Sequence, residues 1–364
     1  MSAPRLEIDL DKITHNARVL VEDLGERGIA VTGVTKAALG AVEVAKAMLR
    51  AGVSGLGDSR IENIEAMRQQ RIAAPIMLIR SPMLSQAERV VKSADISFNT
   101  ELSVVRRLSA AAQDADRVHG IVLMVELGDL REGILPVDLI GAAREVLRLP
   151  NLELTGIGVN LACHSGMAPD ANNMAALSTL ADEVEAALDV SLEIVSGGNS
   201  ANLNWALGKG KVGRINHLRL GEAILLGCEP LHRAPVDGLH TDAITLVAEV
   251  IESKTKPSLP WGTLAETAFG GDVTSTDTGD MSRAILALGE QDMDPGGLVP
   301  PDGLAILGAS GDHLLIDCGK RRLQVGTEVR FAVNYSALIR AMTSPFVDKA
   351  MARGRTARPS LNLA

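Results

Sequence analysis

Residues 29–58 have the sequence IAVTGVTKAALGAVEVAKAMLRAGVSGLGD. The runs 29–35 and 53–57 are rich in β-branched and aliphatic residues, so they predict two strands. Between them, the apolar residues of 42–49 have helical spacing. A strand, a helix and a second strand in this order are typical of a parallel sheet, because parallel neighbours need a crossover connection.

The same alternation continues to about residue 235. We expect six further strands, at 75–79, 95–98, 120–127, 152–160, 192–196 and 216–220. Helical spacing predicts further helices at 13–24, 63–70, 84–91, 101–112, 137–147 and 171–188. Eight units of strand and helix favour closure of the sheet into a (β/α)8 barrel.

After about residue 235 the alternation stops. Turn-rich stretches such as 269–280 now separate the apolar runs, so we predict a second domain that is β-rich and built of strands alone. Its strands are expected at 243–251, 283–288, 304–307, 313–316 and 328–333. The expected domain bounds are 11–240 for the barrel and 241–364 for the β domain. A strand at 5–10 fits either domain, and we group residues 1–10 with the second.

The composition argues against several classes of partner. The 364 residues carry 36 Lys and Arg against 45 Asp and Glu, a net charge of −9, and only 2% are aromatic. Nucleic acid is not an expected partner, because its binding needs a basic face and usually stacking aromatics. We expect a cytoplasmic protein with no membrane contact, since no run approaches the roughly 18 apolar residues of a span and no leader is recognisable. Three widely spaced cysteines fit neither a disulfide framework nor a metal site.

Two features of the expected strand ends indicate the chemistry. Lys36 follows the first strand, where burial lowers the pKa of an amine and favours a Schiff base. Strands 7 and 8 lead into the Gly-rich runs 196–202 and 219–227, and barrels of this type often bind phosphate there. A Schiff-base lysine beside a phosphate site indicates pyridoxal 5'-phosphate (PLP). Sugar-phosphate aldolases also have a Schiff-base lysine and a phosphate site. Arg219 is therefore the residue that helps to distinguish a PLP site from an aldolase site.

Longer motifs carry a family resemblance. The main ones are VTKAALG (34–40), VELGDLREG (125–133), IVSGGNSANL (194–203), LRLGEAILLG (218–227) and NYSALIRAMTSPFV (334–347). With them the sequence resembles, over nearly its whole length, the fold-type III PLP-dependent enzymes of the alanine racemase superfamily, and most of all the ornithine racemase and alanine/ornithine racemase-like branch.

The resemblance implies a fold and an activity. The fold is a PLP-binding (β/α)8 barrel followed by a C-terminal β-rich domain. The activity is that of a PLP-dependent racemase that interconverts the L and D forms of a free amino acid, ornithine or lysine, by proton transfer at Cα. The resemblance also implies a homodimer with shared active sites.

The resemblance further implies roles for matching residues. Lys36 matches the lysine that holds PLP and acts as one of two acid/base groups. Arg219 matches the arginine that faces the pyridine nitrogen; as a charged group that only donates, it disfavours protonation of that nitrogen and favours quick reprotonation of Cα. Arg131 matches the arginine near the cofactor's phenolic oxygen and the substrate carboxylate. The phosphate contacts match Ser200, the Gly221 backbone and Tyr335.

The sequence departs from the family where charge and aromatic groups are expected. Met124 replaces a lysine that alanine racemases usually carry in carbamylated form to orient the arginine, and Asn160 replaces a histidine that stacks on the cofactor ring. Racemisation needs an acid/base group on each face of Cα. Alanine racemases take the second one from a tyrosine of the partner subunit, but the single tyrosine here, Tyr335, already matches a phosphate contact.

The second acid/base group therefore has several candidates. They are Ser258, Asp292, Asp312, His313 and Cys163, and among these residue types histidine and cysteine have the most suitable intrinsic pKa. A distal substrate ammonium also needs an acidic partner, for which Asp292 and Asp312 are candidates. Three other functions stay open: an alanine or broad-specificity racemase, a non-catalytic protein of PLP homeostasis, which would lack the β domain, and a PLP-free Schiff-base aldolase.

Overall fold

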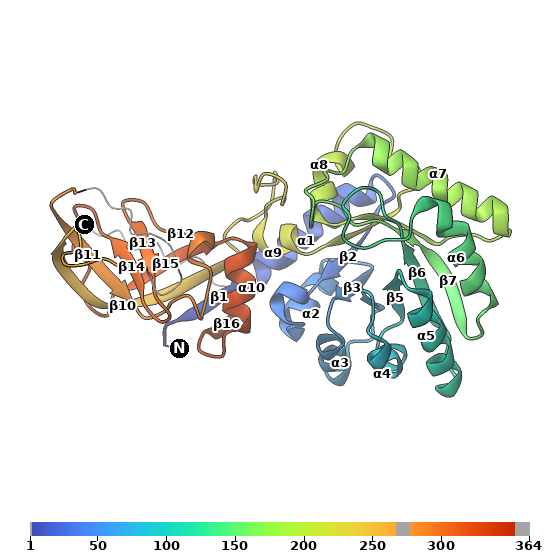
Figure 1. The fold of residues 1–364 in the computed structure, drawn as a ribbon, viewed down its shortest axis with the longest axis horizontal. Helices are drawn as coiled ribbons and strands as arrows, with labels where there is room; N and C mark the ends of the chain where they lie inside the picture. Colours follow the sequence, from blue (N-terminus) through green and yellow to red (C-terminus); the bar gives the residue numbers. More distant parts are fainter. Residues whose placement is uncertain (1, 267–276, 354–364) are drawn as a thin grey trace. The chain divides into compact units, whose positions relative to one another are not determined.

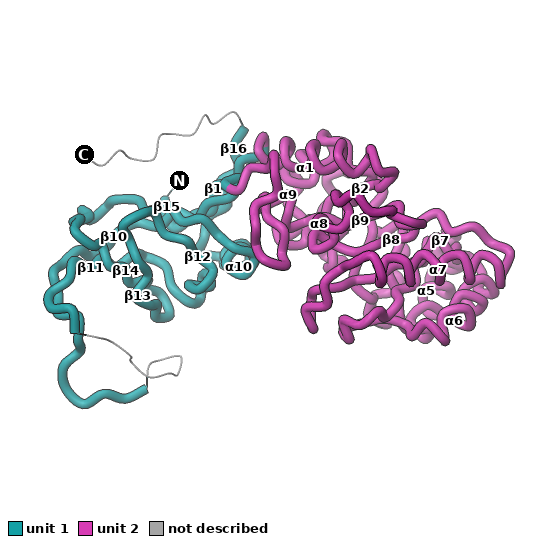
Figure 2. Tube along the Cα trace, turned by 90° about the horizontal axis from the view of Figure 1, so that it is seen from above, with its two compact units in different colours: residues 1–10, 242–364 teal, residues 11–241 magenta. Residues whose placement is uncertain are grey.

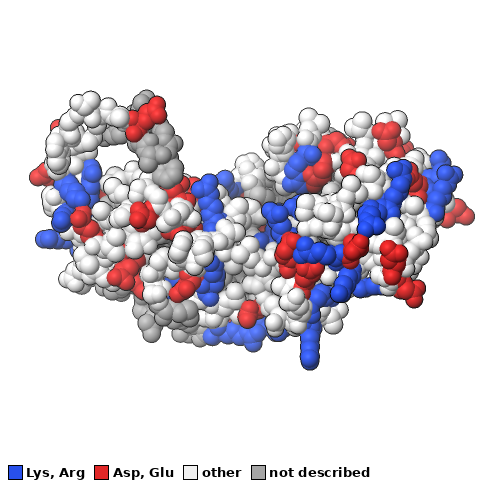
Figure 3. Space-filling model, turned by 60° about the horizontal axis from the view of Figure 1, so that its bottom comes forward, with Lys and Arg blue, Asp and Glu red and all other residues white. Residues whose placement is uncertain are grey.

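The computed structural model describes residues 2–266 and 277–353. The chain forms two compact units, which we call the barrel unit (Asp11–Thr241) and the C-terminal unit (Asp242 onward, together with the residues up to Leu10) (Figure 1 and Figure 2). On the face drawn in Figure 3, Lys and Arg side chains are interspersed with Asp and Glu. None of the helices in the described ranges is both long enough and apolar enough to cross a membrane.

The barrel unit contains a closed sheet of eight parallel strands, which confirms the predicted fold class. Each strand pairs with the next along the chain, and β2 pairs with β9 to close the barrel. The strands are β2 (Ala30–Val34), β3 (Gly55–Asp58), β4 (Ile76–Leu78), β5 (Ile96–Asn99), β6 (His119–Met124), β7 (Leu152–Gly158), β8 (Ile194–Gly198) and β9 (His217–Leu220).

Helices surround these strands (Figure 1). They are α1 (Leu10–Gly25), α2 (Val42–Arg50), α3 (Ile61–Gln69), α4 (Ala87–Ser93), α5 (Leu102–Asp114), α6 (Pro136–Arg148), α7 (Ala171–Leu188), and two short ones, α8 (Leu203–Ala206) and α9 (Glu222–Leu226). The predicted helix 84–91 is divided, because a 3-10 turn, η2 (Leu84–Gln86), precedes α4. Two further 3-10 turns, η1 (Lys36–Ala38) and η3 (Ser200–Asn202), follow β2 and β8.

The strand predicted at 120–127 ends earlier, at Met124. The Glu126 carboxylate accepts hydrogen bonds from the backbone N–H groups of Gly128 (2.6 Å) and Leu130 (3.1 Å) and so turns the chain. At Gly133 the chain passes close to the backbone of Glu126. Its φ of +157° suits glycine, and a Cβ there would lie 2.4 Å from the Glu126 nitrogen. Residues 125–127 therefore begin a tight loop at the carboxyl end of β6.

The C-terminal unit is a mainly antiparallel sheet with the strand order β12-β15-β10-β11-β14-β13. The strand β1, from the start of the chain, pairs antiparallel with β10 and parallel with β16. The strands are β1 (Arg5–Asp9), β10 (Ile244–Pro257), β11 (Asp280–Leu286), β12 (Leu298–Val299), β13 (Ala305–Ala309), β14 (Leu314–Asp317), β15 (Glu328–Val333) and β16 (Asp348–Ala352).

The prediction that this region contains strands alone is wrong. It also holds the helix α10 (Tyr335–Thr343), which Asn334 caps by accepting a hydrogen bond from the Ala337 N–H (3.0 Å), and a 3-10 turn, η4 (Pro295–Gly297). The strands β12 and β16 were not predicted. Residues 269–276 of the turn-rich stretch lie outside the described residues.

Candidate active site

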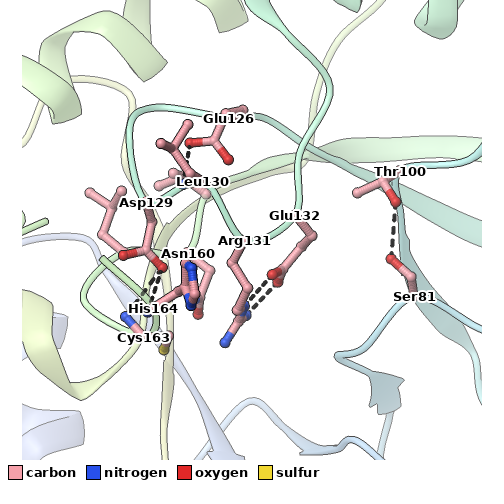
Figure 4. A network of polar contacts seen from close by, with 12 residues as sticks. Ser81, Thr100, Glu126, Asp129, Leu130, Arg131, Glu132, Asn160, Cys163 and His164 are labelled. Carbon is pink, nitrogen blue, oxygen red and sulfur yellow. Dashed lines mark hydrogen bonds and ion pairs between the residues drawn. The ribbon is translucent and has the colours of Figure 1, made fainter. Parts of the chain in front are cut away.

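The carboxyl ends of the barrel strands bring together most of the residues singled out in the sequence. They come from separate segments: Lys36 after β2, Arg131 after β6, Asn160 and Cys163 after β7, Ser200 after β8, and Arg219 with Gly221 at β9. Figure 4 shows the part of this site that the loops after β6 and β7 supply. Cys163, Arg131, Asp58 and Arg219 all act electrostatically on the Lys36 amine.

Lys36 stands at the mouth of the barrel as the first residue of η1. Solvent reaches its side chain, but protein surrounds it on most sides, and this burial lowers the pKa of the amine; Cys163 opposes the shift and Arg131 adds to it. Beside it, Thr35 donates a hydrogen bond from Oγ1 to Asp58 Oδ2 (2.8 Å). The lowered pKa favours the free amine that covalent chemistry at a carbonyl requires.

Arg219 is buried inside the barrel, with 4% of its surface exposed. Its guanidinium donates to Ser196 Oγ and to the Val159 carbonyl (3.0 Å), and it lies 4.9 Å from the centre of the Phe98 ring. Burial lowers the pKa of Arg219 to about 10, so the group stays cationic near neutral pH.

A chain of neutral polar groups continues behind Arg219. Ser196 Oγ lies 2.9 Å from His217 Nδ1, and His217 Nε2 lies 2.8 Å from Thr32 Oγ1. Burial, and then the charge of Arg219, lower the pKa of His217 to about 3, so its imidazole is neutral. The sequence motifs did not single out the side chains of His217 and Ser196. The spacing of His217 and Arg219 could have indicated His217, because alternate residues of a strand point to the same side.

Asn160 offers an unused donor to the site. Its Oδ1 accepts hydrogen bonds from Asn199 Nδ2 (3.1 Å) and Arg219 Nη2 (3.4 Å). Its Nδ2 is buried and has no hydrogen-bond partner among the described residues. A buried donor without a partner is costly, so this amide fits a site that a bound polar group completes.

The segments after β8 and β9 fit a phosphate. Ser200 Oγ accepts a hydrogen bond from the Ala223 N–H (3.2 Å), which leaves its hydroxyl hydrogen free to donate. A Cβ on Gly221 would lie 3.1 Å from Val34 Cβ, so glycine allows the backbone after β9 to pack closely against the end of β2. Together with the Lys36 amine and the Asn160 amide, these groups fit a phosphorylated aldehyde such as PLP.

Asp129 holds the loops after β6 and β7 together (Figure 4). The residue is 1% exposed, and its carboxylate accepts hydrogen bonds from the backbone N–H groups of Cys163 (3.2 Å), His164 (3.1 Å) and Ser165 (3.1 Å). The Cys163 thiol is exposed and lies 3.5 Å from Asn199 Nδ2. The clamp therefore fixes the position of Cys163 at the barrel mouth.

The remaining predicted residues lie in the C-terminal unit. Tyr335 begins α10, and His313 Nδ1 lies 2.6 Å from Asp312 Oδ1 just before β14. Asp292 is buried and accepts hydrogen bonds from Ser344 Oγ (2.8 Å) and the Gly289 N–H (3.2 Å). Ser258 is buried and donates to Asp277 Oδ1 (3.1 Å). These contacts give Asp292 and Ser258 structural roles within their own unit.

Comparison with known proteins adds independent findings. The family model for the alanine racemase N-terminal domain matches residues 8–230. Two relatives align over 352 residues: the ornithine racemase of Acetoanaerobium sticklandii is 38% identical, covering 95% of this chain and 99% of that protein, and the lysine racemase of Thermotoga maritima is 39% identical, covering 96% and 98%. The alanine racemase of Bartonella henselae with covalently bound pyridoxal phosphate shares the fold, with a TM-score of 0.74, 19% identity and coverage of 97% of this chain and 100% of that one.

The Asp129 clamp predicts a local and a global effect of substitution. In Asp129→Asn one acceptor oxygen becomes an N–H donor that faces backbone donors, so we expect the free energy of unfolding to fall by about 2 kcal/mol. We also expect faster hydrogen exchange at the amides of residues 163–165. Urea unfolding and exchange measured by NMR test both, with Asp138→Asn, on the exposed first turn of α6, as control. Unchanged exchange at residues 163–165 would contradict the clamp.

Proposed function

The chain belongs to the alanine racemase family, and we propose that it is a PLP-dependent racemase for free ornithine or lysine. The observation that carries the proposal is a lysine of lowered pKa at the barrel mouth together with the buried Arg219 and the Ser200 hydroxyl after β8. When bound, PLP supplies an electron sink for negative charge at the substrate Cα.

Different barrel residues would bind different parts of the cofactor. Lys36 would hold the cofactor covalently through Nζ, Ser200 and the Gly221 backbone would hold its phosphate, and the Asn160 amide would donate to it. Arg219 is a permanent cation that only donates hydrogen bonds, so it would hold the pyridine nitrogen without delivering a proton to it. In the C-terminal unit, Tyr335 is proposed as a further phosphate contact, on the family resemblance.

Racemisation requires proton transfer on both faces of Cα. We propose that Lys36 Nζ exchanges the proton on one face and that Cys163 Sγ exchanges it on the other. Support comes from the exposed thiol of Cys163 at the barrel mouth and from its electrostatic effect on the pKa of Lys36, Arg131 and Arg219. His313, paired with Asp312, is the second candidate.

The substrate assignment rests on similarity over nearly the full length to the ornithine and lysine racemases. Arg131 would bind the α-carboxylate that every amino acid carries, so it does not select among them. Asp312 is proposed as a partner for a distal ammonium. An alanine or broad-specificity racemase is the alternative function. We further propose a homodimer with shared active sites, whose molar mass light scattering would measure.

Chiral chromatography of holoenzyme reactions tests the function. We expect interconversion of both enantiomers of ornithine and lysine, with kcat/KM at least about tenfold above that for alanine or serine, a difference of about 1.4 kcal/mol in transition-state binding. Equal or higher activity on alanine would favour the alternative function. If none of the four amino acids is interconverted while PLP is bound, the proposal fails.

Lys36→Ala tests the covalent attachment of the cofactor. The variant is expected to lose the visible absorbance band of the bound cofactor and at least about 100-fold in kcat, because it removes both the covalent link and an acid/base group. Lys46→Ala, at an exposed position of α2, should keep both. A racemase activity without any such band in the wild-type protein would argue against PLP, and a band that survives in Lys36→Ala would argue against Lys36.

A pair of variants tests the second acid/base group. Cys163→Ala should lower kcat by at least about 100-fold in both directions, because each direction uses both groups. Cys228→Ala and His313→Gln should stay within a few fold of wild type. If His313→Gln is the impaired variant and Cys163→Ala is not, the assignment passes to His313.

A further inference from the structure

The loop after β6 places two opposite charges side by side at the barrel mouth. Arg131 donates from Nε to Glu132 Oε2 and from Nη2 to Glu132 Oε1, and Figure 4 shows the two side chains facing each other. The side chains are 39% and 26% exposed, so the pair is neither buried nor free in solvent. Glu132 is also the largest cause of the raised pKa of Arg131.

We propose that Glu132 is a positioning residue, which fixes the Arg131 guanidinium so that its remaining edge receives the α-carboxylate of the substrate. This inference rests on the proposed function, because it takes an amino acid to be the substrate. It assigns Glu132 no contact with the reacting atoms.

The geometry of the pair leaves Arg131 able to bind a second carboxylate. A guanidinium has five N–H donors, and the contact with Glu132 uses the edge formed by Nε and Nη2. The end formed by Nη1 and Nη2 keeps three donors, and two of them suit a bidentate carboxylate. Glu132 can therefore hold the arginine without blocking its site for the substrate.

The other acidic side chains of this loop are committed to the backbone. Glu126 accepts hydrogen bonds from Gly128 and Leu130, and Asp129 accepts them from residues 163–165. Met124, at the end of β6, is 3% exposed and packs in an apolar cluster with Phe98 and Val122, so it offers Arg131 no charge. Glu132 is the carboxylate that remains to orient the guanidinium.

Backbone hydrogen bonds hold the loop that carries Arg131 and Glu132. The N–H of Ile134 donates to the Met124 carbonyl (2.8 Å), and the N–H of Glu126 donates to the Ile134 carbonyl (2.9 Å), so both ends of the loop are joined. A free arginine side chain loses up to about 2 kcal/mol of rotamer entropy when a ligand immobilises it. Holding Arg131 in place beforehand reduces that loss on substrate binding.

Propionate is the probe for this role, since it carries a carboxylate but no amine that reacts with the cofactor. Its dissociation constant from the holoenzyme is measured by calorimetry for wild type, Glu132→Gln, Glu132→Asp, Arg131→Gln and the double variant with Gln at both positions. Glu88→Gln, which changes an exposed glutamate paired with Arg107, is the matched control. Ornithine kinetics are measured on the same proteins.

We expect Glu132→Gln to weaken propionate binding about tenfold, within the range of coupling energies between contacting residues, and to raise KM for ornithine more than it lowers kcat. Glu132→Asp should recover most of the affinity. The Glu132→Gln change should have no further effect in the Arg131→Gln background, because Glu132 acts through Arg131. Glu88→Gln should match wild type.

Two results would overturn the inference. One is unchanged propionate affinity in Glu132→Gln, and in that case a KM defect for ornithine alone would mean that Glu132 binds the distal ammonium directly. The other is an additive effect in the double variant. If the propionate pattern holds but no amino acid is racemised, the proposed function fails while the pairing of Glu132 with Arg131 stands.

Discussion

Burial of the Arg219 guanidinium is the constraint on which the rest of the site depends. Removing a cation from water costs several kcal/mol unless the protein replaces the lost contacts. Here the replacements are neutral: the Ser196 hydroxyl, the Val159 carbonyl, the Asn160 amide and the face of Phe98. The cation in turn helps to keep His217 neutral and adds to the lowered pKa of Lys36. One arrangement thus supplies a fixed positive charge and a more nucleophilic amine.

The two departures from the family are Asn160 and Met124. Asn160 has no aromatic ring to stack on the cofactor. Its Oδ1 accepts a hydrogen bond from Arg219, and its buried Nδ2 has no partner among the described residues, so an amide donor stands where the family has an aromatic surface. Met124 carries no charge, and the carboxylate beside Arg131 comes from the next residue along the chain, Glu132. An amide at Asn160 and a carboxylate at Glu132 thus supply polar contacts that differ from those of the family.

The barrel was predictable because strands buried on both faces are continuous aliphatic runs, and eight of them alternate with helical spacing. The small strands β12 and β16 were not predictable from the sequence. The strand β12 has only two residues, and β16 depends on pairing with β1 from the other end of the chain. The helix α10 had a signal, the Asn334 cap before helically spaced apolar residues. Lys36, Ser200 and Arg219 were found from strand ends and motifs. The contact between Arg131 and Glu132 depends on the loop conformation, which cannot be predicted from the fact that the two residues are adjacent in the sequence.

We propose that two different side chains of this protein exchange the Cα proton, one on each face. Racemisation of L-ornithine in D2O, followed by mass spectrometry of the separated enantiomers at early times, tests it most directly. We expect deuterium at Cα in the D-ornithine formed, while the recovered L-ornithine keeps its protium, because the group that removes the proton from one face is not the group that delivers a proton to the other face. Equal deuterium in both enantiomers at early times, or D-ornithine without deuterium, would contradict it.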